Sequence, residues 1–262
     1  MIKKIALIGN GNVAFHLAKR LKETGSPIAG LVVRDQSKTS DFKSLLSRNA
    51  LITTQNDLSD FNWDIIILAV SDSAIPEIIK QFRFPAKAIA LHCSGSQPIT
   101  RFEKSDIEKY GVLYPLQTFS KEKEIQFESV PLYIEGSNAT VEKEIREFGE
   151  ALSPNVSVLN SNQRLKLHMA AVIACNFSNA LYSVAQSQLN EIGLNFEVLA
   201  ALVAETAEKA IDIGPTKAQT GPAARKDQEV IDKHLEVLES RPEIKSIYQQ
   251  LSNLIGNSQK DD

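Results

Sequence analysis

The sequence lacks the features of several common protein classes. Its 262 residues include two cysteines, Cys93 and Cys175, without CxxC spacing, so we expect no disulfide framework and a reduced, cytoplasmic environment. The four histidines show no HxxxH or related ligand spacing, so no metal site is predicted. The net charge of −3 gives no basic surplus, which argues against nucleic-acid binding. No apolar run approaches the roughly 20 residues of a membrane span, so no membrane segment is expected.

The order of predicted elements changes once along the chain. The first part alternates short apolar strands with amphipathic helices, a pattern typical of βαβ units. We predict strands at 4–8, 28–34, 64–70, 88–92, 112–114, 130–135 and 156–159, with helices at 13–24, 41–47, 73–82 and 138–152. Beyond them we predict helices at 162–192, 195–213, 226–238 and 242–254, a loop at 214–222 and a fraying tail at 256–262. The pattern indicates an α/β fold, with a doubly wound, mainly parallel Rossmann sheet in residues 1–160 and an all-helical domain in 161–262.

A glycine-rich turn joins the first predicted strand to the first helix. Residues 5–14 read IALIGNGNVA, the GxGxxA form of the dinucleotide-binding fingerprint. Gly9 permits the tight turn, Gly11 lets the backbone approach a pyrophosphate, and Ala14 allows close helix–strand packing. A bare structural turn is the alternative. We predict a dinucleotide held by Gly9, Asn10, Gly11, Asn12 and Val13.

The end of the second strand bears on which dinucleotide binds. NAD-binding folds place an acidic residue there for the ribose hydroxyls, whereas this chain has Val33 followed by Arg34. A guanidinium grips a 2′-phosphate bidentately, and Ser37 and Lys38 lie close in sequence. The sequence therefore favours NADP as cofactor. In the alternative, Asp35 binds the ribose and Arg34 is solvated.

The strand at 64–70 ends in residues expected near the nicotinamide. Ligands of open α/β sheets bind outside the carboxyl ends of the strands, which assigns Val70 and Ser71 to the nicotinamide–ribose side. Asp72 or Ser73 is expected to cap the next helix rather than to take part in catalysis.

Several further motifs together resemble one family. They are LHCSGS at 91–96, YPLQTFS at 114–120, KLHMAA at 166–171 with CNF at 175–177, TGPAARKD at 220–227, and HL at 234–235. The combination resembles Rossmann-like proteins with a C-terminal DUF2520 domain, relatives of pyrroline-5-carboxylate reductase, prephenate dehydrogenase and the β-hydroxyacid dehydrogenases, and covers essentially the whole chain. The resemblance implies an NADP oxidoreductase whose helical domain dimerises and closes the substrate cleft. Lys226 departs from the pattern, because family members commonly have glycine there.

His168 is the first candidate for proton transfer. Ideal helical spacing places Cys175 and Asn179 close to its face, with Asn176 a quarter-turn away, and histidine suits proton transfer near neutral pH. The alternative is a core histidine bonded to backbone.

Four other positions offer groups to a substrate. Ser94 and Gly95 form a turn at a strand end that presents a hydroxyl and amides. Gln117 is suited to donate to a substrate oxygen, and Arg225 to bind a carboxylate bidentately. The alternatives are structural. Ser94 and Gly95 would form an ordinary strand-end turn, Gln117 would anchor its loop, and Arg225 would pair with Asp227 or take part in capping. We expect His168 and Ser94 to be catalytic and Gly95, Gln117, Asn176 and Arg225 to bind substrate.

The sequence therefore predicts a cytoplasmic NADP-dependent oxidoreductase that reduces a small oxo acid or an imine, and the resemblance implies a ketopantoate-like compound as one candidate. We expect a small-molecule substrate and a homodimer formed through the helical domain, with no nucleic-acid or membrane partner. One alternative is a dehydrogenase of a hydroxy or cyclohexadienyl acid. The other is a non-catalytic regulator that binds NADP(H).

Overall fold

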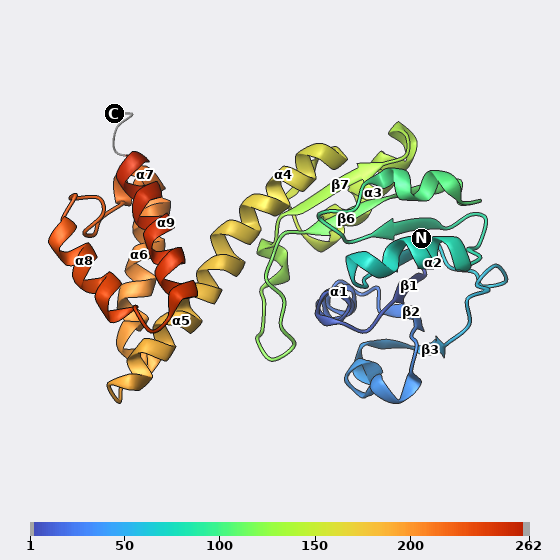
Figure 1. Cartoon of the computed structure of the whole chain (residues 1–262). Helices are drawn as coiled ribbons and strands as arrows, with labels where there is room; N and C mark the ends of the chain where they lie inside the picture. The colour runs from blue at the N-terminus through green and yellow to red at the C-terminus, as the bar shows by residue number, and fades with distance from the viewer. Residues whose placement is uncertain (1–2, 259–262) are drawn as a thin grey trace. The chain divides into compact units, whose positions relative to one another are not determined.

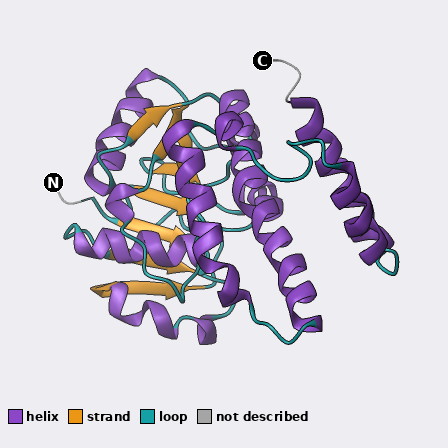
Figure 2. Ribbon diagram, turned by 90° about the vertical axis from the view of Figure 1, so that its left-hand side faces the viewer, coloured by secondary structure: helices purple, strands orange, loops and turns teal. Residues whose placement is uncertain are grey.

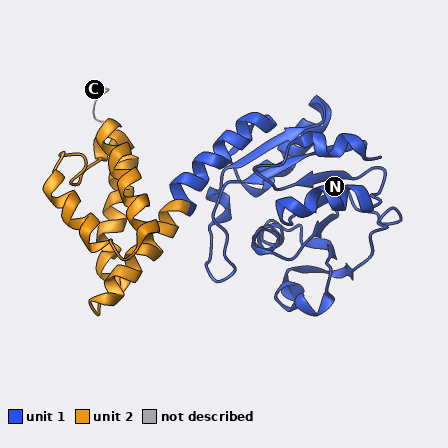
Figure 3. Cartoon of the chain, in the orientation of Figure 1, with its two compact units in different colours: residues 1–176 blue, residues 177–262 orange. Residues whose placement is uncertain are grey.

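The computed structural model of the chain describes residues 3–258. It divides into two compact units, residues 1–176 and 177–262 (Figure 3). The first unit contains the β-sheet, and the second is built from helices (Figure 1). The helical part of the sequence begins at Ser161, so its first helix belongs to the first compact unit.

The described residues form one eight-stranded sheet in the order β3-β2-β1-β4-β5-β6-β7-β8. Neighbouring strands run parallel except β6 and β7, which are antiparallel. This order confirms the predicted doubly wound, mainly parallel Rossmann sheet. The strands are β1 (Ile5–Ile8), β2 (Ile28–Val32), β3 (Leu46–Thr53), β4 (Ile65–Leu68), β5 (Ile89–His92), β6 (Lys109–Pro115), β7 (Leu132–Gly136) and β8 (Val156–Val158).

Helices cover both faces of the sheet (Figure 2). Alternate residues of β1 pack into two separate cores, because side chains of a strand point to opposite faces. Leu7 lies in the core shared with α1 (Asn12–Glu23) and α3 (Ala139–Leu152), and Ile8 lies in the core shared with α2 (Ile75–Gln81). Burial on both faces explains why the central strands read as continuous apolar runs.

The edge strand β3 is absent from the sequence-based assignment. The helix predicted at 41–47 is a short 3-10 helix, Ser40–Leu45, and the chain then continues as β3. Arg48 and Asn49 are exposed on this strand, which pairs only with β2. An edge strand tolerates such polar residues, so its sequence carries no clear apolar alternation.

The C-terminal part is helical, as predicted, with three local differences. Residues 161–191 form one helical run made of α4 (Ser161–Ala171), a π-helical turn (Val172–Phe177) and α5 (Ser178–Glu191). The loop expected at 214–222 contains a short helix, α7 (Pro215–Ala218), which begins with proline, a residue suited to a first helical position. The fraying predicted from residue 256 is wrong up to Ser258, where α9 ends, and residues 259–262 lie outside the described part. The remaining helices are α6 (Ala200–Ile213), α8 (Gln228–Val237) and α9 (Pro242–Ser258).

The run Ser161–Glu191 is long and apolar enough, by length and composition, to cross a membrane. Its most apolar window has a mean hydropathy of 1.2, so the expectation that no stretch meets this criterion is wrong. A single helix of this kind is weak evidence for a membrane span. No residue of this most apolar stretch of the run is buried in the structure. It therefore differs from the core helix of a soluble protein, whose apolar side chains are mostly buried.

Candidate functional site

The turn between β1 and α1 requires glycine at its first position. Gly9 has a φ of 109°, and its amide donates to the carbonyl of Val32 over 2.9 Å. A Cβ atom on Gly9 would lie 2.5 Å from the carbonyl oxygen of Ala69. Only glycine combines this backbone conformation with so close an approach to the end of β4.

Gly11 leaves open space in front of the first turn of α1. It is the N-cap residue, so no side chain caps the helix there, and the first turn contains no acidic residue. A Cβ atom on Gly11 would meet nothing within 4 Å. The start of α1 therefore presents backbone amides and the positive end of the helix dipole to an accessible space, which fits a pyrophosphate.

The two asparagines of the turn use their side chains to hold neighbouring segments. Asn10 Nδ2 donates to the carbonyl of Lys38 over 2.8 Å, and Asn12 Nδ2 donates to the carbonyl of Phe119 over 2.9 Å. These bonds tie the turn to the segment after β2 and to the loop after β6. Because these side chains are engaged, the cofactor contacts predicted for Asn10 and Asn12 would be made by their backbone amides, as would that of Val13.

The segment after β2 presents an unpaired guanidinium. Val33 is 6% exposed and lies in the core, whereas Arg34 is exposed and makes no hydrogen bond or ion pair with a described residue. The Asp35 carboxylate accepts from the amide and hydroxyl of Ser37, at 3.0 and 2.7 Å. These bonds, with the charge of Lys38, hold the pKa of Asp35 below its usual range. Asp35 is therefore engaged in the turn, while Arg34 is free to bind an anion.

Asp72 does not cap a helix. The chain enters a 3-10 helix (Asp72–Ala74) before α2, so the N-cap positions fall on Ser71 and Ala74, and neither makes a side-chain capping bond. The prediction that Asp72 or Ser73 caps the next helix is therefore wrong. Instead, Oδ2 of Asp72 accepts from the hydroxyl of Ser96 over 2.5 Å. This bond links the carboxyl ends of β4 and β5.

Ser94 holds the turn that follows β5. It is 5% exposed, and its Oγ accepts from the amides of Ser96 and Gln97, at 3.1 and 2.9 Å. Its own amide donates to Nδ1 of His92 over 3.2 Å. Because the hydroxyl is buried and occupied, its contact with substrate stays a prediction.

His92 supports the same turn as a neutral ring. Burial, followed by the charge of Arg164, lowers its pKa to about 3. Since Nδ1 accepts from Ser94, the proton lies on Nε2, which is buried and has no hydrogen-bond partner among the described residues. His92 is thus a positioning group for the Ser94 turn.

A buried ion pair joins α4 to this turn. Arg164 is 1% exposed and pairs with Glu135 of β7. Its Nε donates to the carbonyl of Ser94 over 3.2 Å and its NH2 group to that of Gln97 over 2.7 Å. Glu135 also accepts from the amide and hydroxyl of Ser161. Sequence reasoning missed Arg164, although an arginine one helical turn before His168 was a usable signal.

His168 lies between the Ser94–Gly95 turn and the end of β6. Its Nδ1 is 3.1 Å from the hydroxyl of Tyr114, and the two rings are nearly perpendicular. A Cβ atom on Gly95 would lie 2.7 Å from Cγ and Nδ1 of His168, so glycine is required for this approach. His168 is half-buried, and its Nε2 makes no hydrogen bond with a described residue. That nitrogen is available to a ligand.

Tyr114 is a site residue that sequence analysis missed. Its side chain is 8% exposed, and burial, followed by the charge of Asp72, raises the pKa of its hydroxyl. The phenol therefore stays protonated at neutral pH. Its sequence signals were its place at the carboxyl end of a strand and at the start of the YPLQTFS motif.

The π-helical turn changes the helical spacing from which Cys175, Asn176 and Asn179 were predicted to lie near the face of His168. Asn176 lies within this turn, where hydrogen bonds skip one more residue than in an α-helix, so ideal helical geometry does not apply. Both Cys175 and Asn176 are exposed. Gln117 is exposed as well, and its Oε1 accepts from the amide of Thr118 over 2.8 Å. Substrate contacts of Asn176 and Gln117 stay predictions.

Arg225 belongs to the second unit and is exposed. Its predicted alternative partner, Asp227, instead caps α8 by accepting from the amide of Val230 over 3.3 Å. Lys226 between them has a φ of 57°, the one positive value among the described non-glycine residues.

We expect Lys226→Gly to stabilise the protein by about 0.5 to 1 kcal/mol. Glycine avoids the left-handed strain of about 1–2 kcal/mol, which exceeds its added cost in unfolded-chain entropy. Urea unfolding of the two proteins measures the difference. Lys217→Gly, inside α7, is the matched control and should destabilise. A loss of stability in both variants would show that the lysine conformation is not strained.

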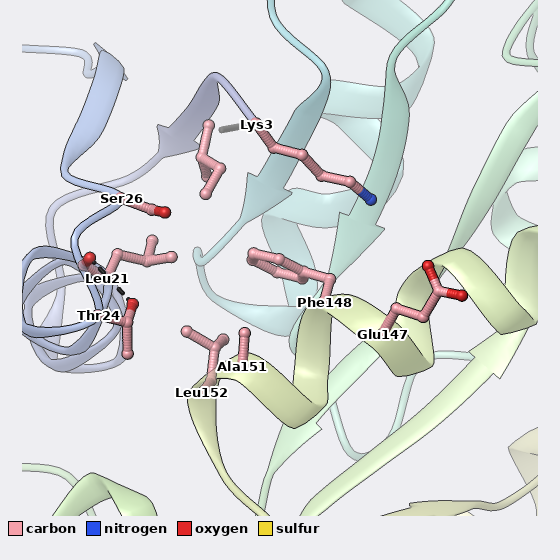
Figure 4. A pocket seen from close by; sticks show the side chains of 9 residues that line it. Lys3, Leu21, Thr24, Ser26, Glu147, Phe148, Ala151 and Leu152 are labelled. Carbon is pink, nitrogen blue, oxygen red and sulfur yellow. Dashed lines mark hydrogen bonds between the residues drawn. The ribbon is translucent and has the colours of Figure 1, made fainter. Parts of the chain in front are cut away.

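One cavity in the described part of the chain lies away from these groups. It has a volume of about 510 Å³ and is bounded by the start of β1 and the carboxyl-terminal ends of α1 and α3 (Figure 4). Lys3, Leu21 and Phe148 are among its lining residues. This is the amino edge of the sheet, so the cavity is not the dinucleotide site. No group of three or more potential metal ligands occurs within residues 3–258.

Two family models match the chain. Residues 4–90 match the model described as NADP oxidoreductase, coenzyme F420-dependent, and residues 130–255 match the domain of unknown function DUF2520. Protein BF3122 from Bacteroides fragilis, named as a candidate NADP oxidoreductase, is 35% identical, with a TM-score of 0.86 over 97% of this chain and 98% of that one. The chain belongs to this family of DUF2520 NADP oxidoreductases. Family membership confirms the predicted oxidoreductase class and the predicted NADP cofactor.

More distant structures share the fold. Protein TM1727 from Thermotoga maritima is 19% identical, with a TM-score of 0.72 over 98% of both chains. An imine reductase from Myxococcus stipitatus in complex with NADP+ is 15% identical, with a TM-score of 0.68 over 98% of this chain and 94% of that one. No curated protein sequence matches the chain.

Proposed function

We propose that this DUF2520 protein is an NADPH-dependent reductase of a small molecule with a C=N or C=O bond. The observation that supports the proposal is that anion-binding groups and polar side chains lie along the same edge of the sheet. An open helix N-terminus and a free Arg34 lie near β1 and β2, and Asp72, Tyr114 and His168 gather at β4 to β6. A nicotinamide dinucleotide spans this distance in Rossmann folds, and when bound it supplies a hydride.

The cofactor is assigned to the glycine-rich turn, the segment after β2 and the end of β4. The amides that follow Gly9 and Gly11 face the pyrophosphate, and the Arg34 guanidinium pairs with the 2′-phosphate. Lys38 adds to this anion site, Ser37 holds Asp35 in the turn beside it, and Val70 and Ser71 flank the nicotinamide ribose.

The proton is assigned to His168. Its free Nε2 donates to the nitrogen or oxygen of the substrate, and Tyr114 orients the ring through Nδ1. Gly95 admits the ring to the turn after β5, and Arg164 holds that turn in place. Half-exposure of His168 lets solvent restore the proton. Ser94 acts by shaping the turn.

We expect NADPH to bind at least tenfold more tightly than NADH, and Arg34→Ala to remove most of this preference, about 1.4 kcal/mol or more. The reason is that the 2′-phosphate loses its bidentate partner, the Arg34 guanidinium. Fluorescence titration with both cofactors measures it. Arg83→Ala, which removes an exposed charge elsewhere on the unit, is the control and should leave the preference intact. Equal affinities in the wild type, or no effect of Arg34→Ala, would assign the ribose to Asp35.

The reaction itself is tested by following NADPH absorbance with a panel of cyclic imines and 2-oxo acids. Turnover with any of them supports the reductase. Turnover only with NADP+ and hydroxy or cyclohexadienyl acids would identify the dehydrogenase instead. Tight cofactor binding with no turnover in either direction would identify a regulator.

We further propose that two copies of the chain associate through the run Ser161–Glu191. Apolar side chains recur on it at every fourth position and are 40–57% exposed, an unusual density of uncovered apolar groups. They are Leu165, Met169, Ile173, Phe177 and Leu181. Identical stripes on two copies are self-complementary, as a two-fold dimer requires.

We expect light scattering to give a mass near twice 28.9 kDa for the wild type and near 28.9 kDa for Met169→Glu combined with Phe177→Glu. Two buried, unpaired carboxylates would make association unfavourable. Lys166→Glu, on the same helix, is the control and should remain dimeric. A monomeric wild type would refute the proposed dimer.

A further inference from the structure

We propose that Asp72 makes the reacting site selective for a substrate whose reacting group carries positive charge, a protonated imine, and unfavourable for a 2-oxo acid. This inference rests on the proposed reductase function and chooses between its two substrate classes. Sequence reasoning assigned Asp72 to helix capping, a role that the structure excludes.

The Asp72 carboxylate has one oxygen committed and one free. Oδ2 accepts from Ser96 over 2.5 Å, whereas Oδ1 has no hydrogen-bond partner among the described residues. The side chain is half-buried and follows Val70 and Ser71, the residues that flank the nicotinamide position. In the proposed cofactor position, this free carboxylate oxygen would lie near the nicotinamide.

No described cation neutralises Asp72. It forms no ion pair, and the nearby Arg164 is buried and paired with Glu135. The two other titratable rings at this edge are neutral, because burial lowers the pKa of His92 to about 3 and raises the pKa of Tyr114. The negative charge of Asp72 acts on both rings, because it tends to raise the pKa of His92 and that of Tyr114. A ligand with a positive reacting group would supply the missing countercharge.

The chemistry of an imine uses this charge directly. A proton passes from Nε2 of His168 to the imine nitrogen, which becomes positively charged, and solvent returns a proton to the ring. With NADPH bound, its hydride would add to the carbon, the C=N π pair would move to nitrogen, and an amine and NADP+ would result. Asp72 stabilises the iminium that exists between these steps. A 2-oxo acid would instead bring its own carboxylate toward Asp72, and like charges repel.

The test compares two substrates on three proteins. NADPH oxidation is followed with 2-methyl-1-pyrroline, a cyclic imine, and with pyruvate, a 2-oxo acid. Asp72→Asn removes the charge, keeps the shape and retains an oxygen for Ser96. Glu77→Gln makes the same change on the exposed face of α2, where Glu77 contacts only Gln81, and serves as control.

We expect the wild type and Glu77→Gln to prefer the imine. Asp72→Asn should lower kcat/KM for the imine at least tenfold without lowering it for pyruvate. A preference of the wild type for pyruvate, or an unchanged ratio in Asp72→Asn, would overturn the inference while leaving the reductase function standing. Turnover of neither substrate, nor of the wider panel, would count against the reductase function itself.

A binding measurement tests Asp72 without turnover. Calorimetric titration of the NADP+-loaded protein with pyrrolidine, a cation at neutral pH, should give at least tenfold weaker binding to Asp72→Asn, a difference of about 1.4 kcal/mol. Equal affinity for the wild type and Asp72→Asn would overturn the inference whatever the turnover result.

Discussion

His168→Gln is expected to lower kcat about 100-fold or more for any substrate that the protein reduces, with little change in NADPH affinity. A positioned general acid typically contributes 10²- to 10⁴-fold. Glutamine fills a similar volume but donates no proton, so the substrate nitrogen or oxygen must be protonated by water. Single-turnover measurements at saturating NADPH separate this loss from effects on binding or product release.

Tyr114→Phe is the matched variant for this prediction. It keeps the aromatic packing and removes only the hydroxyl that contacts Nδ1 of His168. We expect a smaller loss of kcat and a shifted pH profile, because the ring loses the group that fixes its orientation. If His168→Gln retains the wild-type single-turnover rate, the proton comes from another donor. If Tyr114→Phe leaves the pH profile unchanged, the tyrosine only packs.

Arg164→Met is expected to destabilise the protein by about 3–5 kcal/mol. Removing one partner of a buried ion pair leaves the other charge uncompensated, here that of Glu135, which is 14% exposed at its side chain. The carbonyls of Ser94 and Gln97 lose their donors as well. Urea unfolding followed by circular dichroism measures the change in the free energy of unfolding.

The double variant Arg164→Met with Glu135→Gln separates charge from packing. Because it removes the stranded carboxylate, it should recover a substantial part of the lost stability. Arg101→Met, at an exposed arginine that donates to the Gln97 side chain, is the control and should change stability by about 0.5 kcal/mol or less. A loss in Arg164→Met no larger than this control value would mean that the ion pair is dispensable.

The predictable part of the fold rests on local signals. The apolar run Ile65–Leu68 and the GxGxxA turn each specify their own structure, because burial on both faces and glycine-dependent turns are visible in consecutive residues. Edge strand β3 and the π-helical turn lacked such signals. Polar residues are tolerated at an edge, and a single widened helical turn leaves the apolar pattern almost unchanged.

The site divides in the same way. The glycine-rich turn, the cofactor class and the candidacy of His168 were all predictable from the sequence, since each depends on a short motif or on residue chemistry. Only the tertiary structure brought together Asp72 with Ser96, Glu135 with Arg164 and Tyr114 with His168, which are 24, 29 and 54 residues apart. These pairs form where the carboxyl ends of neighbouring strands meet α4, and strand order and helix placement are set by packing of the whole unit. No local pattern records which distant side chain will stand opposite a given one.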